Sequence, residues 1–299
     1  RKRNDMLSNH RYTDYHTEDD WLEGRRAGIG ASEAAGILQP AGYEWSSPWS
    51  IWAEKVGILK PKKSKQERRF FVGHVLEPAI SQMFMLETGI DVWNPGDFRI
   101  YQGEVGFQLA TIDRFTSDDV PVELKSSARM SDWDSGPPIY YQIQGQHQIA
   151  VTGADKVHFC VFFGASFDFR AYTMERNDRF IDAMTDAERE FWGLVEAEVA
   201  PAVDGLQATK EALQRLPFDP DTRVEIPATE LRKLDDLRSE AKLELERAER
   251  KLNEAESSIK ELMGAAEVAL LDGQPAYTWK ADKRGTRRFL RVLRGELDG

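Results

Sequence analysis

Acidic and basic side chains lie at short spacing near the middle of the sequence, where they could bind a metal ion and act on a phosphate ester. Asp113 ends one predicted strand, and Glu123 and Lys125 lie on the next. Residues two apart on a strand project from the same face, and a short turn would return Asp113 beside them. Carboxylate oxygens bind hard divalent cations such as Mg²⁺, which polarise a scissile phosphate and lower the pKa of bound water.

A lysine and a further acid extend this candidate site. Lys125 could orient an attacking water or balance charge that develops on the phosphate, and Glu77 adds a third carboxylate from the upstream segment GHVLEPAI. The alternative is that Glu123 and Lys125 form a surface ion pair on an edge strand and that Glu77 is a solvated helix residue. The strand VPVELK is apolar apart from this pair, which favours the site.

Composition narrows the class of protein. The chain has 299 residues, 41% of them hydrophobic, which is enough for a sizeable core in one large domain or two smaller ones. Its single cysteine, Cys160, excludes an intrachain disulfide framework and a cysteine-ligated zinc or iron–sulfur site within one chain. No apolar run is long enough to span a membrane, and no secretory segment is visible, so we expect a cytoplasmic protein with no membrane partner.

Charge is distributed unevenly along the chain. The net charge of −11 argues weakly against a passive nucleic-acid coat, but not against an enzyme that acts on DNA. Residues 55–69 and residues 280–294 each hold seven basic side chains and one acidic side chain. Such clusters can bind phosphates; the alternative for either segment is solvated surface.

The predicted elements around the candidate site alternate between helices and strands. Residues up to about 15 are polar and predicted to be loose, and Ser32 is predicted to cap a helix. Pro78 should kink its helix or mark the true start. The patterns predict helices over 32–38, 48–56, 66–86, 140–151 and 177–199, and strands over 97–102, 107–112, 120–124, 156–163 and 167–173. This order predicts an α/β core.

The C-terminal part of the sequence follows a different pattern. Residues 201–227 are predicted to be a proline-rich connection, and residues 270–293 a β-hairpin around 282–285 with Tyr277, Trp279, Phe289 and Val292 on its apolar side. Between them lies a heptad seam with one polar position: Leu231, Leu234, Arg238, Ala241, Leu245, Ala248, Leu252, Ala255, Ile259 and Leu262. The seam predicts a long helix that packs against another subunit or against the 177–199 helix. We therefore predict two domains, 1–215 and 216–299.

The order of motifs resembles a known family. The motifs are Gly73…Glu77, Ile112-Asp113, Glu123-Leu124-Lys125 and a glutamine-rich helix with Tyr141, Gln144 and Gln146, preceded by the stretch 21–33, WLEGRRAGIGASE. Together they resemble the phage lambda-type alkaline exonucleases (YqaJ-like viral recombinases) of the PD-(D/E)xK nuclease superfamily. The resemblance covers residues 21–199 and implies a restriction-endonuclease-like core, a central mixed sheet flanked by helices. The long helix and hairpin would be a C-terminal extension.

The resemblance implies roles for the residues at the centre of the site. Asp113 and Glu123 would bind the metal, together with the carbonyl of Leu124. Lys125 would position the nucleophilic water, and Glu77 would support the metal or its water. The sequence departs from the family at Thr111-Ile112, where a proline commonly precedes the aspartate.

The resemblance also implies a pocket for the 5′-terminal phosphate of DNA. Arg25, Ser32 and Gln144 would contact this phosphate, and the sequence leaves open whether Arg25 or Arg26 points inward. Arginine binds phosphate through two donors, and a serine at a helix N-terminus lies where free N–H groups favour an anion.

The function implied is a Mg²⁺-dependent deoxyribonuclease, with Mn²⁺ as a substitute and one or two ions bound. It would digest linear duplex DNA from 5′ to 3′ and leave 3′ single strands for annealing-type phage recombination. The resemblance further implies a ring-shaped homotrimer around DNA and a single-strand annealing protein as partner. The alternatives are a RecB-like or structure-selective nuclease of the same fold, and a non-catalytic DNA-binding or assembly protein.

Overall fold

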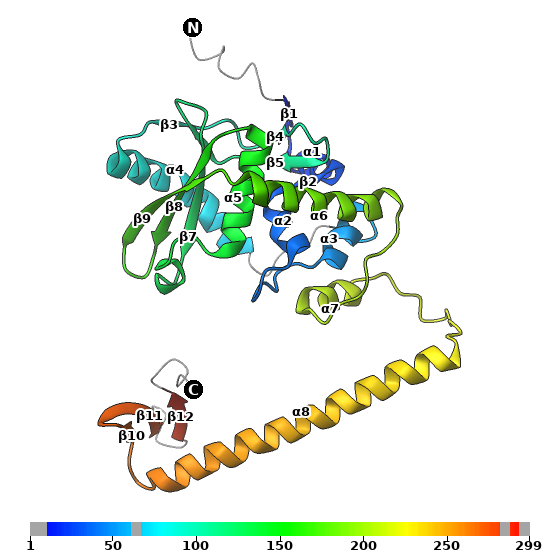
Figure 1. Ribbon diagram of the computed structural model, residues 1–299, viewed down its shortest axis with the longest axis vertical. Helices are drawn as coiled ribbons and strands as arrows, with labels where there is room; N and C mark the ends of the chain where they lie inside the picture. The colour runs from blue at the N-terminus through cyan, green and yellow to red at the C-terminus, as the bar shows by residue number, and fades with distance from the viewer. Residues whose placement is uncertain (1–10, 61–66, 282–287, 293–299) are drawn as a thin grey trace. The chain divides into compact units, whose positions relative to one another are not determined.

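The computed structural model describes residues 11–60, 67–281 and 288–292. The chain divides into two compact units, the first ending at Phe218 and the second beginning at Asp219 (Figure 1). The first unit is mixed α/β. Its elements are β1 (Arg11–Asp14), α1 (Glu18–Gly24), η2 (Arg25–Ala27), β2 (Ile29–Gly30), α2 (Ala31–Leu38), α3 (Pro48–Lys55), α4 (Glu67–Thr88), β3 (Val92–Trp93), β4 (Arg99–Gln102), β5 (Gln108–Ala110), β6 (Arg114–Thr116), β7 (Pro121–Ser127), η3 (Ser131–Trp133), α5 (Ile139–Thr152), β8 (Lys156–Phe163), β9 (Asp168–Glu175), α6 (Asp178–Glu196) and α7 (Gln207–Gln214).

A five-stranded sheet, in the order β3-β6-β7-β8-β9, is covered by helices on both faces (Figure 1). Side chains alternate across β8, as the period of two requires. Val157, Phe159, Val161 and Phe163 pack with α2, α5 and α6, whereas Cys160 packs with α4. The sequence prediction of a buried strand followed by a hairpin partner is confirmed, because β9 pairs antiparallel with β8.

The strand that carries the candidate site follows the same alternation. In the parallel pairing of β7 with β8, Glu123 lies beside Phe159 and Leu124 beside Cys160. The face that holds Glu123 is therefore the one that α5 covers, and the face of Leu124 is the one that α4 covers. Helix α5 sits close to the sheet because residue 145 is glycine: a Cβ there would lie 2.6 Å from Cζ of Phe159.

A second sheet, in the order β1-β4-β5-β2, consists of strands that precede Asp113 in the sequence. Strand β1 lies within the segment predicted to be loose, so that part of the prediction is wrong. Its pairing partner β4 lies far away in sequence, and four residues give no local signal of such a pairing. Helix α2 begins one residue earlier than predicted and its N-cap is Gly30, not Ser32.

Two helical segments differ from their predicted form. Pro78 neither starts nor ends α4, since the helix runs through it from Glu67 to Thr88. The predicted connection after residue 201 contains α7, whose Thr209 hydroxyl hydrogen-bonds the hydroxyl of Ser47, the N-cap of α3. That contact spans most of the unit's sequence, so local patterns could not predict it.

The second unit contains α8 (Ala228–Met263) and a three-stranded sheet of β10 (Val268–Leu271), β11 (Gln274–Ala281) and β12 (Arg288–Val292). The predicted long helix is confirmed, and it ends at Gly264 as expected. The predicted hairpin is also confirmed, since β11 pairs antiparallel with β12, although residues 282–287 lie outside the described residues. Its predicted apolar side is wrong, because Val292 lies opposite Tyr277 whereas Phe289 lies opposite Lys280, so the four residues do not share one face. Within the described part of the chain, no helix is both long and apolar enough to cross a membrane.

Candidate active site

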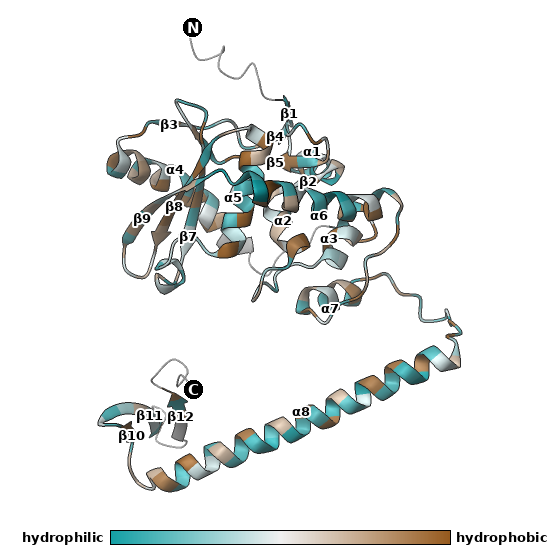
Figure 2. Cartoon of the chain, in the orientation of Figure 1, coloured by the Kyte–Doolittle hydropathy of each residue, from teal (hydrophilic) through white to brown (hydrophobic). Residues whose placement is uncertain are grey.

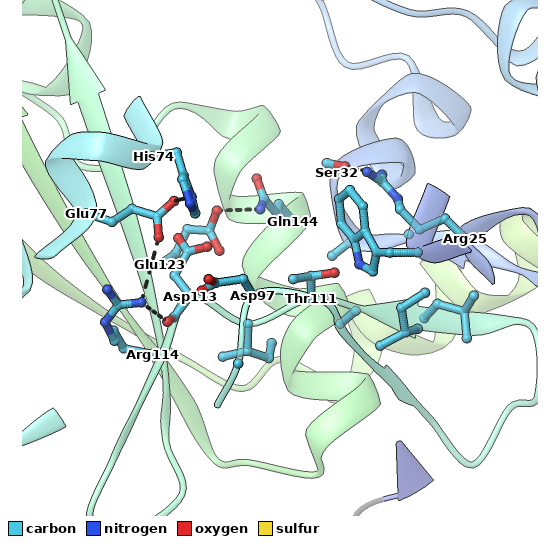
Figure 3. A pocket seen from close by; sticks show the side chains of 18 of the residues that line it. Arg25, Ser32, His74, Glu77, Asp97, Thr111, Asp113, Arg114, Glu123 and Gln144 are labelled. Atoms are coloured by element: carbon cyan, nitrogen blue, oxygen red, sulfur yellow. Dashed lines mark hydrogen bonds and ion pairs between the residues drawn. The ribbon is translucent and has the colours of Figure 1, made fainter. Parts of the chain in front are cut away.

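A cavity of about 240 Å³ in the first unit brings the predicted site residues together. Figure 3 shows Glu77, Asp113 and Glu123, together with Asp97, toward one end, Arg25 and Ser32 at the other, and Gln144 between them. The predicted residues that line the cavity are Arg25, Ser32, Glu77, Asp113, Glu123 and Gln144. Lys125 and Leu124 adjoin it through direct contacts with Glu123 and Asp113.

Glu123 is almost fully buried and accepts hydrogen bonds at both oxygens. Gln144 Nε2 donates to Oε1 at 2.6 Å, Gln148 Nε2 donates to Oε2, and the Lys125 ammonium pairs with Oε1. Gln144 and Gln148 are one helical turn apart on α5, so their amides face the same carboxylate. Gln148 is not among the residues that the sequence predicted for the site; the structure adds it.

Asp113 lies beside this carboxylate at the start of the β6–β7 hairpin. Its Oδ2 accepts the Leu124 backbone N–H at 2.8 Å, which confirms the predicted return of the chain. Burial raises the pKa of Asp113 well above its usual value, and the neighbouring charge of Glu123 raises it further. The site therefore brings two carboxyl groups together where little water can solvate their negative charge.

Positive groups surround the carboxylates. Burial opposes the charge of Lys125, but the combined effect of Glu123, Tyr141 and Asp113 outweighs burial and raises the pKa of Lys125. The Lys125 ammonium also lies 4.8 Å from the ring centre of Tyr141. Glu77, on α4, is 3.7 Å from the Arg114 guanidinium and 3.2 Å from the His74 ring.

The donor set suits a hard divalent cation. Among the described residues, no three His, Cys, Asp or Glu side chains are grouped so that they could hold a metal by themselves. Mg²⁺, however, commonly uses one or two carboxylates and keeps several waters. Asp113 and Glu123 supply such a pair, and Oε1 of Gln148 is a buried acceptor that has no hydrogen-bond partner among the described residues.

The opposite end of the cavity contains the predicted phosphate-binding side chains. Arg25 Nη2 donates to the Ser32 hydroxyl at 3.2 Å, and the Arg25 guanidinium lies 5.1 Å from the ring centre of Trp21. Arg26 instead pairs with Glu23 at 2.9 Å and donates to the carbonyl of Lys55. The structure thus places Arg25, not Arg26, in the cavity.

An ion pair that the sequence did not predict anchors this end. Lys55 Nζ lies 2.7 Å from Glu33 Oε2 and donates to the Arg25 carbonyl, also at 2.7 Å. Glu33 in turn accepts the Gly30 N–H at 2.7 Å. Lys55 is buried, so it does not belong to an exposed phosphate-binding patch over 55–69, and residues 61–66 of that segment lie outside the described residues.

A buried pair behind the cavity joins three elements that position it. The His147 ring on α5 lies 2.7 Å from Glu188 on α6 and 3.0 Å from the carbonyl of Leu109 on β5. Both side chains are fully buried. A carbonyl can only accept, and an ionised carboxylate can only accept, so the charged imidazole with two N–H donors satisfies both contacts.

We expect Glu188→Gln to lower the free energy of unfolding by about 3 kcal/mol at pH 6, because it leaves His147 buried without its counter-charge. Burial opposes the charge of His147, but Glu188, the Leu109 carbonyl and Glu33 together outweigh burial and raise the pKa of His147 above the unfolded value. The pair therefore stabilises fully below pH about 6.5, and the stabilisation is lost as pH rises through the raised pKa.

Denaturant unfolding of the full chain at pH 6 and pH 9 tests this expectation. The difference between wild type and Glu188→Gln should shrink at pH 9. Glu190→Gln is the matched control, since Glu190 is exposed on the same helix. A difference that grows with pH would show that His147 is not the charged partner.

The comparisons with known proteins agree with this geometry. Residues 20–155 match the model of the YqaJ-like viral recombinase domain. The matched stretch is slightly less than half of the chain. The uncharacterized protein YqaJ of Bacillus subtilis (strain 168) is 32% identical over 206 residues, which are 67% of this chain and 63% of that protein. The chain thus spans less than two thirds of the length of this relative.

The fold of the YqaJ-like domain is also found among solved structures. An alkaline exonuclease (LHK-Exo) from Laribacter hongkongensis matches with a TM-score of 0.50 at 22% identity, over 60% of this chain and 94% of that one. The structure of LHK-Exo in complex with dAMP matches over the same shares, also at 22% identity, with a TM-score of 0.51. At this level of identity the likeness shows a shared mixed α/β fold.

Proposed function

We propose that this protein is a Mg²⁺-dependent exonuclease that digests linear duplex DNA from a 5′-phosphorylated end and leaves 3′ single strands for annealing-type recombination. The observation that carries the proposal is the cavity itself, which joins a carboxylate–lysine cluster to an arginine–serine pair. The match of residues 20–155 to the YqaJ-like viral recombinase domain supports it. So does the fold shared with an enzyme described as an alkaline exonuclease.

In the proposed mechanism, the two ends of the cavity have different tasks. Asp113, Glu123 and the Leu124 carbonyl would hold the cation, as in a PD-(D/E)xK core. When bound, the cation would polarise the scissile phosphate and lower the pKa of the attacking water. Lys125, beside Glu123, would orient that water. Arg25 and Ser32 would hold the terminal phosphate, and Gln144 would reach it from between the two ends.

The remaining parts of the proposal concern assembly. A homo-oligomeric ring, a trimer in related enzymes by the resemblance, would keep the protein on its DNA, and a single-strand annealing protein would receive the product strand. The basic segment 280–294 is a second candidate contact for DNA, although residues 282–287 and 293–294 lie outside the described part of the chain.

The test uses linear duplex DNA labelled at one 5′ end, with a phosphate or a hydroxyl there, in Mg²⁺ or EDTA. We expect Mg²⁺-dependent release of the 5′ nucleotide, faster from the phosphorylated end. Arg25→Gln should slow digestion of phosphorylated ends by roughly 10- to 100-fold, the equivalent of a charged hydrogen bond of about 1.5–3 kcal/mol. It should slow digestion of hydroxyl ends much less.

The neighbouring substitution Arg26→Gln is the control, because Arg26 pairs with Glu23 away from the cavity. Equal losses on both kinds of end for Arg25→Gln would contradict the phosphate pocket. Internal cuts or release from the 3′ end would keep the metal site but contradict the proposed polarity. Binding without any cleavage would favour a non-catalytic DNA-binding protein.

A further inference from the structure

Helix α8 presents an apolar seam that the described residues of its own unit leave largely exposed. Its 36 residues make a rod roughly 54 Å long, and apolar and polar residues alternate along its whole length (Figure 2). Of its residues only Met263 is buried. The seam leucines at 231, 234, 245, 252 and 262 are each half or more exposed.

The helix of the first unit that the sequence suggested as a partner does not offer its apolar face. Helix α6, the partner considered from the sequence, already packs Ile181, Met184, Phe191 and Val195 in the core of the first unit. A seam sustained over more than four heptads typically pairs with another helix. We propose that α8 pairs antiparallel with α8 of a second copy of this chain.

The sizes of the seam residues favour the antiparallel arrangement. The a positions are Leu231, Arg238, Leu245, Leu252 and Ile259, and the d positions are Leu234, Ala241, Ala248, Ala255 and Leu262. An antiparallel pair sets each a residue against a d residue of the other helix. Leu245 then faces Ala248 of the second copy and Leu252 faces Ala241, so a large side chain meets a small one.

A parallel pair would match the same residues badly. Each a residue would face its own copy, which places Arg238 against Arg238. The three alanine layers would also face one another and leave space unfilled, at a cost in packing. In the antiparallel register Arg238 faces Ala255, which leaves room for the guanidinium to reach the water at the edge of the seam.

The flanking charges favour the same arrangement. With Leu245 opposite Ala248, Glu244 lies beside Lys251 of the second copy, and Lys242 lies beside Glu249. In a parallel pair Glu244 would instead face Glu249. The antiparallel register does bring Asp235 near Glu256, but each is neutralised within its own helix, by Arg238 at 3.2 Å and by Lys260 at 2.8 Å.

Engineered disulfides in the full chain test the direction of pairing. The one native cysteine, Cys160, is buried in the first unit and does not compete. The double variant Leu231→Cys/Leu262→Cys should form a covalent dimer under mild oxidation on a non-reducing denaturing gel. The single variants Leu231→Cys and Leu262→Cys should stay monomeric there, because each position faces the other one across the pair.

A second pair of variants tests which face of the helix is used. Leu245→Glu should halve the molar mass measured by light scattering, whereas Leu243→Glu, an equally exposed leucine outside the seam, should leave it unchanged. Covalent dimers from either single cysteine variant would show a parallel pair and overturn the proposal. So would a double variant that stays monomeric, or equal effects of the two glutamates.

Discussion

Asp113→Asn is expected to lose at least about 1,000-fold of the Mg²⁺-dependent activity on linear duplex DNA, about 4 kcal/mol of transition-state stabilisation, without losing stability. The amide removes the charge that would hold the cation. Its oxygen can still accept the Leu124 N–H, the contact that fixes the β6–β7 hairpin. The variant also removes one of two neighbouring buried carboxylates, which repel each other in the absence of a cation.

The combination of lost activity and retained stability is the informative result. Initial rates of nucleotide release measure the activity, and thermal unfolding in EDTA measures the stability. Asp118→Asn is the matched control, since Asp118 lies exposed in the turn of the same hairpin. Activity within tenfold of wild type would contradict the metal assignment, and a much lower unfolding temperature would mean that Asp113 has a structural role.

Lys125→Met is expected to slow cleavage by roughly 100- to 1,000-fold, the loss typical when one donor to developing charge is removed, without weakening cation binding. Methionine keeps much of the apolar stem but removes the ammonium, which lies over the Tyr141 ring. When no cation is bound, that ammonium pairs with Oε1 of Glu123 and so occupies an oxygen that would bind the cation. Its removal should therefore leave the affinity for a divalent cation unchanged or raise it.

Calorimetric titration with Ca²⁺ measures cation binding separately from the cleavage rate. The rate in Mg²⁺ should fall while the Ca²⁺ affinity holds, and Lys210→Met, at an exposed position on α7, should change neither. A weaker Ca²⁺ affinity in Lys125→Met would mean that the lysine organises the ligands. An unchanged rate would remove Lys125 from the mechanism.

Local patterns in the sequence were sufficient to predict the elements that carry most of the site residues. The apolar run KVHFCVFF predicted β8, and the glutamine-rich segment predicted α5, because each pattern lies within one element. Asp113 and Glu123 could be brought together because only one hairpin separates them. The seam over 231–262 predicted α8 for the same reason.

The two basic segments show the limit of composition. Counting charges over 55–69 suggested an exposed surface, yet Lys55 is buried against Glu33. Charge along the sequence does not reveal which side chains the fold turns inward. The predicted hairpin around 282–285 has the same limit, since its charged turn lies outside the described residues.

The sequence by itself determined the main helices and strands around the site, the carboxylate–lysine cluster and the long C-terminal helix, since each depends on residues that are near one another along the chain. Only the tertiary structure decided that Arg25 and not Arg26 faces the cavity, that Gln148 binds Glu123, and that His147 pairs with Glu188. These contacts depend on the packing of α5 against β7, β5 and α6. Burial there forces polar groups to find partners far away in sequence, and no local pattern records which partner they find.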